Sequence, residues 1–130
     1  MSLSDAMRIS STGLTAERFR LDVVSSNLAN ANTGAIGGAP PYRRRLVELE
    51  GGPNGVKIVG VVPDMSPFHT KVDWGDPNHN PKTGLVETSN VQPIAEMVDM
   101  LSASRAYQAN ISAFNSAKSM VQSALSIGKV

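Results

Sequence analysis

Residues 3–33 read LSDAMRISSTGLTAERFRLDVVSSNLANANT, and apolar side chains recur along this stretch in alternating steps of four and three residues. The series consists of Leu3, Met7, Ser10, Leu14, Glu17, Leu21, Val24, Leu28 and Ala31. Such a heptad pattern places one narrow apolar seam along a helix, which is typical of a helix that packs against another helix. The stretch therefore predicts a long N-terminal helix that begins near Ser2 or Ser4 and ends near Asn30, with Gly34 free to adopt the left-handed conformation.

A second seam of the same kind lies at the other end of the chain. Its series consists of Met97, Met100, Ser104, Tyr107, Ile111, Phe114, Lys118, Val121 and Leu125. We expect a helix from about Asn90 to Ile127, with Pro93 in its first turn and Gly128 as its stop. A helix with so narrow a seam depends on its partner for stability, and the polar residues that interrupt both seams weaken the pairing. Our hypothesis is that both ends are partly disordered in the free monomer and become ordered on assembly.

The middle of the chain carries turn residues and short strand patterns. Tyr42–Glu50 and Val56–Val62 resemble the two arms of a hairpin, Pro67–Asp73 and Leu85–Thr88 suggest further short strands, and residues 76–84 read as an exposed loop. The prediction is an α+β fold with an N-terminal coiled-coil helix at 1–34, a small β-rich segment at 35–89 and a C-terminal coiled-coil helix at 90–130.

Composition restricts the function. The chain has 130 residues and a formal net charge of +1, which gives no electrostatic reason to expect nucleic acid or an anionic membrane as partner. It has no cysteine, which excludes thiolate catalysis and cysteine-ligated metals. No stretch has the apolar length of a signal peptide or a membrane span. These features alone would indicate a cytoplasmic protein, although a protein exported without a cleaved signal would look the same.

Candidate chemical groups are few. The two histidines, His69 and His79, lie near Asp73 and Asp76, but their spacing matches no metal motif and solvated turn residues are the favoured interpretation. The basic triplet at residues 43–45 has no aromatic platform beside it, so a solvated strand face or an intersubunit salt-bridge patch is favoured over a nucleic-acid site. We expect no active site, no cofactor, no metal and no small-molecule substrate.

Two charged residues, Glu17 and Lys118, lie on the seams and leave two interpretations open. Each side chain could extend outward at the edge of its seam. Alternatively, each could pair with an opposite charge across an interface and so fix the register of the helices.

Two motifs at opposite ends of the chain resemble signatures of one family. Val24–Thr33, VSSNLANANT, is similar to the end of the first helix in the bacterial flagellar rod and hook family. Three segments resemble the matching C-terminal signature of that family, namely Ser89–Val91, Glu96–Met100 and Ser104–Asn110. Within that family the short middle segment excludes the hook protein and the larger distal rod protein. Four short stretches resemble the C-type proximal rod proteins, namely Pro41–Arg44, Gly55–Ile58, Pro67–Phe68 and Ile127–Gly128. One departure from that pattern is Ala95, where a second acidic residue is commoner.

The resemblance implies a structural, non-enzymatic subunit of the flagellar basal body. Such a subunit leaves the cell through the flagellar type III export apparatus without a cleaved signal, and polymerises helically in the periplasm into a hollow, torque-transmitting drive shaft. The implied partners are other copies of the chain, other proximal and distal rod proteins, the rod-base adaptor and the membrane-ring protein. A soluble helical adaptor or export chaperone is the main alternative, and a cell-wall-opening enzyme is a weaker one.

The expected assembly interface combines seam residues with signature residues. The seam positions should pack together either within one subunit or between neighbours. The interface is predicted to contain Leu14, Leu21, Val24, Asn27, Leu28, Asn30, Met97, Met100, Arg105, Tyr107, Asn110, Ile111, Phe114 and Val121.

Overall fold

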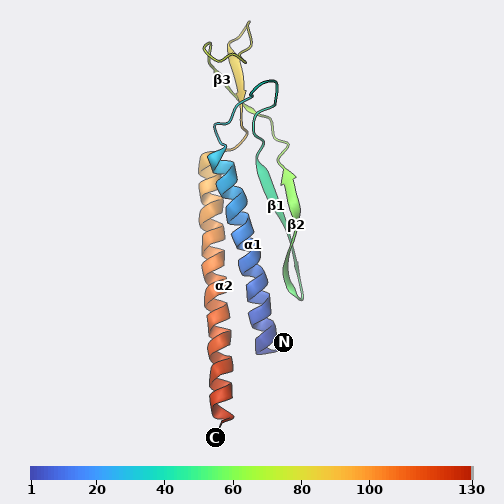
Figure 1. Cartoon of the computed structure of the whole chain (residues 1–130), viewed down its shortest axis with the longest axis vertical. Coiled ribbons are helices and arrows are strands. Elements are labelled where there is room, and N and C mark those ends of the chain that lie inside the picture. Colours follow the sequence, from blue (N-terminus) through green and yellow to red (C-terminus); the bar gives the residue numbers. More distant parts are fainter. Residues whose placement is uncertain (130) are drawn as a thin grey trace.

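The computed structural model describes residues 1–129, which form two long terminal helices with four short strands between them (Figure 1). The elements are α1 (Leu3–Ala29), β1 (Arg45–Gly52), β2 (Gly55–Pro63), β3 (His69–Val72), β4 (Leu85–Thr88) and α2 (Pro93–Ile127). The α+β class and the order of the elements are confirmed. Val130, the last residue of the segment predicted as the C-terminal coiled coil, lies outside the described residues.

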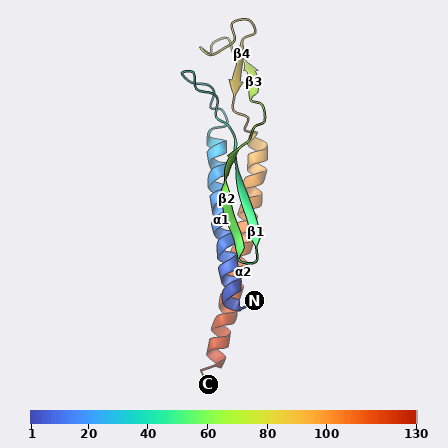
Figure 2. The same ribbon diagram turned by 90° about the vertical axis from the view of Figure 1, so that its right-hand side faces the viewer.

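The two helices pack side by side and run antiparallel (Figures 1 and 2). Helix α1 has 27 residues and helix α2 has 35, so at roughly 1.5 Å per residue they are about 40 and 52 Å long. The C-terminal end of α2 therefore continues past the start of α1, as Figure 1 shows. None of the described helices combines the length and apolarity that a membrane crossing needs.

Helix α1 begins and ends at the residues that its sequence predicts, but its stop is built differently. Ser2 forms a capping box with Asp5, whose backbone N–H donates to Ser2 Oγ at 3.1 Å. At the other end Asn30 has a φ of −106° and its side chain donates to the carbonyl of Ser26 at 2.8 Å. Gly34 has no positive φ, so the expectation of a left-handed glycine there is wrong. An amide side chain satisfies the helix end instead.

Strands β1 and β2 form an antiparallel hairpin that lies along α1 (Figure 2). The tip of the hairpin is fastened to the helix by two contacts. The backbone N–H of Val56 donates to Thr12 Oγ1 at 3.0 Å, and Arg8 donates to the carbonyl of Asn54 at 3.1 Å. A two-stranded ribbon is marginal by itself, so this helix supplies the support that the hairpin needs.

Strands β3 and β4 form a second antiparallel ribbon, paired from His69↔Thr88 to Val72↔Leu85. This ribbon and the loop between its strands form an arm that projects beyond the helix pair, at the end away from both termini (Figure 1). The structure therefore has two separate two-stranded sheets in its described part. The sequence predicts the strands but does not reveal this division.

The contact between the helices differs from the predicted seam at every second position of α2. The large residues Met100, Tyr107, Phe114 and Val121 are half-buried. Between them, however, the inward positions are Ala103, Asn110 and Ala117, each one residue before the predicted Ser104, Ile111 and Lys118. Small side chains such as those of the two alanines allow two helices to approach closely. The heptad pattern of the sequence instead favours the next residue along the chain.

Two residues of the predicted interface, Met97 and Ile111, are consequently more exposed than the inward positions beside them. Met97 is 59% exposed and Ile111 is 38% exposed. Met97 is thus the more open of the two side chains, and packing of either residue against a neighbouring subunit stays a prediction.

Candidate functional site

The end of α1, the start of β1 and the first turns of α2 meet in a cluster of polar residues that we call the junction: Asn27, Arg44, Asp64, Asn90, Glu96 and Asp99. Asn27 is its centre and is only 1% exposed. Its amide oxygen accepts from the backbone N–H of Arg45 and from the Tyr42 hydroxyl, both at 3.0 Å. Its amide nitrogen donates to the Arg45 carbonyl at 2.9 Å and to Glu96 at 3.0 Å. One side chain thus joins both helices to the hairpin.

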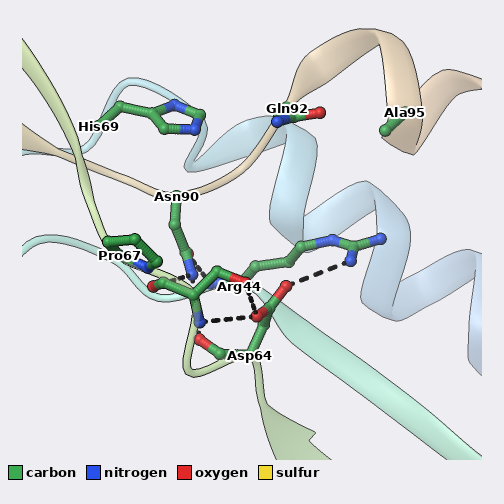
Figure 3. Close-up of a pocket in the computed structure, with 8 residues that line it drawn as sticks. Arg44, Asp64, Pro67, His69, Asn90, Gln92 and Ala95 are labelled. Carbon is green, nitrogen blue, oxygen red and sulfur yellow. Dashed lines mark hydrogen bonds and ion pairs between the residues drawn. The ribbon is translucent and has the colours of Figure 1, made fainter.

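Asn90 binds the residue before β1 and the residues that follow β2 (Figure 3). Its oxygen accepts from the backbone N–H of Arg44 at 2.7 Å, and its nitrogen donates to the carbonyls of Asp64 and Ser66 at 3.0 and 3.1 Å. The two asparagines therefore bind the consecutive backbone groups at which the chain enters β1. This arrangement fixes where the hairpin leaves the helix pair.

The Arg44 side chain connects three carboxylates. Its Nε donates to Glu96, its Nη2 to Asp99 at 3.0 Å and its Nη1 to Asp64 at 3.4 Å. Burial alone disfavours the charge of the guanidinium, but hydrogen bonding to Glu96 and the nearby carboxylates outweigh it and raise the pKa of Arg44. The rigid fork of an arginine suits such a three-way contact.

Glu96 is the most buried charged group described, with 0% exposure. Its two oxygens are occupied by Asn27 and Arg44. Within residues 1–129, every buried side-chain nitrogen or oxygen atom has a hydrogen-bond partner. The buried ion pair is thus hydrogen-bonded on both carboxylate oxygens, which connects α2 to α1 and to the entry of β1.

A cavity of about 180 Å³ opens beside the junction and is lined by Arg44, Asp64, Ser66, Pro67, His69, Asn90, Gln92 and Ala95 (Figure 3). Asp64 accepts from both the hydroxyl and the backbone N–H of Ser66, which, together with Arg44, lowers the pKa of its carboxyl. The described residues contain no group of three potential metal ligands. The second histidine, His79, packs against the Trp74 ring with centroids 5.6 Å apart.

The residues predicted for the assembly interface fall into three groups. Val24 and Asn27 are buried, and Met97, Arg105 and Ile111 are exposed. The half-buried group consists of Leu14, Leu21, Leu28, Asn30, Met100, Tyr107, Asn110, Phe114 and Val121. Of the two charges on the predicted seams, Glu17 contacts Arg20 of its own helix at 3.5 Å, and Lys118 is exposed.

Sequence reasoning missed the role of Arg44, Asn90 and Glu96. Glu96 was named only within the Glu96–Met100 signature, although it is one heptad before the inward-facing Ala103. A carboxylate at a seam position, together with an arginine at the entry of a predicted strand, was the signal that could have revealed the junction.

The outward face of α2 is apolar and nearly uncharged over its first turns. Ile94, Met97, Val98 and Leu101 are all more than half exposed. The bare end of the same helix adds Met120, Leu125 and Ile127. Large exposed apolar patches of this kind are typical of surfaces that bind other proteins.

Comparison with known proteins identifies both terminal segments. The model of the family "Flagella basal body rod protein" matches residues 7–34, and that of "Flagellar basal body rod FlgEFG protein C-terminal" matches residues 82–127. The flagellar basal-body rod protein FlgC of Borreliella burgdorferi is 40% identical, over 98% of both chains. FlgC of Bacillus subtilis is 38% identical and FlgC of Escherichia coli O157:H7 is 36% identical, each over 99% of this chain and 100% of the relative. The chain belongs to the FlgC family of flagellar basal-body rod proteins.

Proposed function

We propose that this chain is a structural subunit of the proximal rod of the bacterial flagellar basal body. The observation that carries the proposal, beside the family, is the uncovered apolar face of α2. One side of this helix packs on α1, while Met97 and Leu101 on its other sides are more than half exposed. Burial of such a surface against other subunits gives a favourable free energy of about 25 cal/mol per Å².

Assembly proceeds through contacts between different surfaces of adjacent subunits. Because such heterologous contacts do not close on themselves, they generate a helical filament. Other copies and other proximal and distal rod proteins are the neighbours, with the rod-base adaptor and membrane-ring protein at the base. The subunit reaches the periplasm through the type III export apparatus without a cleaved signal peptide. The resemblance of the terminal motifs supports this route.

Transmission of torque follows from the same geometry. The helix pair forms the wall of a hollow shaft, and the junction prevents the hairpin and the arm from swinging against it. Asn27 binds the backbone of Arg45 at the start of β1, and Asn90 binds the backbone of the preceding Arg44. The Arg44 side chain binds α2. The role is mechanical and non-enzymatic, and the fully bonded ionisable groups of the junction support it.

The residues of the predicted interface have two different roles, which depend on whether they face α1 and α2 or the outside of the helix pair. The inward residues, such as Val24 and Phe114, build the helix pair, and the outward residues Met97, Arg105 and Ile111 contact neighbours. Leu21 is half-buried and belongs to the first group. A charge at an outward position should therefore block assembly without unfolding the subunit.

The test uses a bacterial strain whose own rod subunit is replaced by this chain. Ile111→Asp should abolish motility and basal-body rods, while export and the helical circular dichroism of the purified chain remain. Ile111→Val is the matched control and should preserve motility. Motile cells that carry Ile111→Asp would exclude this face as an interface. Failure of both variants to be exported would favour a role before assembly, such as that of an export chaperone.

A further inference from the structure

The apolar contact between the helices repeats every seven residues. On α2 the half-buried large residues Met100, Tyr107, Phe114 and Val121 alternate with the small buried Ala103 and Ala117. If α2 slid by seven residues along α1, most of these side chains would be replaced by others of the same kind. The apolar seam therefore stabilises the pair but does not determine its register.

Two contacts break this repeat. The first is the hydrogen bond between Asn27 and Glu96 at 3.0 Å, which is buried on both sides. The second is the approach of Asn110 to Gly13, where a Cβ on the glycine would lie 2.8 Å from the Asn110 amide. Fourteen residues, or two heptads, separate Gly13 from Asn27, and the same interval separates Glu96 from Asn110. Both contacts thus belong to one antiparallel register.

A slip of one heptad would destroy both contacts at once. With α2 displaced in one direction, Ala103 would face Asn27 and Ala117 would face Gly13. Glu96 would then have no partner on α1. A buried amide and a buried carboxylate without partners are costly, whereas the apolar part of the seam would lose little.

The register also determines the position of the hairpin. The atoms of Asn27 that do not bind Glu96 bind the backbone of Arg45 and the hydroxyl of Tyr42. Arg44, the residue before this strand, binds the other oxygen of Glu96. The correct pairing of the two helices is therefore coupled to the docking of β1.

We propose that the Asn27–Glu96 and Gly13–Asn110 contacts form a register lock, in which Asn27 and Glu96 are positioning residues that align α2 with α1 and with the hairpin. They act on assembly without touching a neighbouring subunit. A slip of seven residues shifts the outward face of α2 by about 10 Å relative to the hairpin. That effect on assembly rests on the proposed function, whereas the register itself does not.

The experiment uses introduced cysteine pairs, which report without interference because the chain has no cysteine of its own. Ala6 and Ala117 lie one heptad beyond the Gly13–Asn110 contact in the same register, so Ala6→Cys with Ala117→Cys reports correct pairing. Ala6→Cys with Ala124→Cys reports a slip of seven residues. Cross-linking with a short thiol reagent is measured in the full-length purified chain and in isolated basal bodies.

In the parent chain the first pair should cross-link and the second should not. Glu96→Ala should lower the yield of the first pair at least several-fold and raise that of the second. Glu96→Gln, which keeps an oxygen for Asn27, should restore most of the correct pairing. Asp99→Asn is the matched control because it removes another carboxylate from Arg44 without touching Asn27, and it should leave the yields unchanged.

A second variant guards against simple unfolding of Glu96→Ala, which circular dichroism would reveal. Asn27→Asp places two carboxylates together and should lose the register. Adding Glu96→Gln should recover part of it, because donor and acceptor are exchanged between the helices while the bond to the Arg45 carbonyl stays lost. Unchanged yields in both Glu96→Ala and Asn27→Asp would overturn the lock. If variants with lowered yield of the correct cysteine pair still build functional rods, the register lock is upheld. That result would count against the proposed role of the outward face in assembly.

Discussion

Thr12 and Gly55 touch where the tip of the β1–β2 hairpin rests on α1. Thr12 Oγ1 accepts the backbone N–H of Val56 and donates to the carbonyl of Ile9, so its position is fixed. Gly55 has a φ of 111°, and a Cβ on it would overlap the hydroxyl of Thr12. The glycine thus satisfies two separate requirements, a backbone conformation that other residues rarely adopt and a close approach to the helix.

Gly55→Ala should therefore destabilise the protein by about 1–3 kcal/mol and loosen the hairpin tip from the helix. Urea denaturation gives the free energy of unfolding, and hydrogen exchange at Val56 reports the tip. Gly60→Ala is a matched control in the same strand, because a Cβ there meets no atom within 4 Å and its φ is not positive. Equal effects of the two substitutions would show that the contact with Thr12 is unimportant.

Gly13→Ala should destabilise the parent chain, but it should stabilise a chain that also carries Asn110→Ala. In the parent chain the new methyl group would lie 2.8 Å from the Asn110 amide, and overpacking of this kind costs about 1–3 kcal/mol. With Asn110→Ala the obstacle is absent, and the better helix propensity of alanine should stabilise by about 0.5–1 kcal/mol. A double-mutant cycle by denaturation measures the coupling. Additive effects would contradict a direct contact between the two residues.

The sequence predicts those parts of the fold that depend on interactions between residues close together in the chain. Ser2, Pro93 and Gly128 mark the helix ends because caps and proline act on the neighbouring backbone, and these marks agree with the structure. The hairpin was predicted for the same reason. Its docking on α1 through Thr12 depends on residues more than 40 positions apart, and no local pattern encodes it.

The candidate site was predicted less well, because apolarity alone selects the wrong neighbour. Ile111 fits a heptad better than Asn110, yet Asn110 is the side chain that lies over Gly13. Glu96 has the features of an exposed helix-start residue, and only the approach of Asn27 and Arg44 in three dimensions makes its burial possible. The signature motifs indicated that these positions matter, but not that Asn27 binds within its own chain.

Acid should weaken the junction through Asp64. Hydrogen bonds from Ser66 and the nearby Arg44 hold the pKa of Asp64 below its ordinary value of 3.8. A carboxyl whose folded pKa is lowered stabilises the protein above the unfolded pKa, and this contribution is lost as the pH falls through the folded value. Ser66→Ala removes the hydroxyl donor, so the loss of stability between pH 5 and about pH 2 should be smaller than in the parent chain.

Denaturation of the parent chain, Ser66→Ala and Asp64→Asn at both pH values checks this. Asp64→Asn has no carboxyl to protonate at this position and should show a smaller pH dependence than the parent. A Ser66→Ala chain with the same acid sensitivity as the parent would show that the serine does not stabilise the ionised carboxyl.

Arg44 should be the least replaceable of the three consecutive arginines. Arg44→Ala leaves the buried Glu96 with Asn27 as its remaining partner, and breaking a buried ion pair in this way costs about 3 kcal/mol or more. Arg44→Lys should recover little, because one ammonium cannot reach Asp64, Glu96 and Asp99 together in the geometry of the guanidinium fork.

Arg45→Ala is the neighbouring control. Arg45 is exposed and takes part in the junction through its backbone, so losing its side chain should cost less than about 1 kcal/mol. Urea denaturation of the three variants ranks them. If Arg44→Ala and Arg45→Ala were equally stable, Glu96 would not depend on Arg44 for its charge. The loss of this partner from the buried Glu96 predicts instead an Arg44→Ala chain well below both the parent and Arg45→Ala in stability at neutral pH.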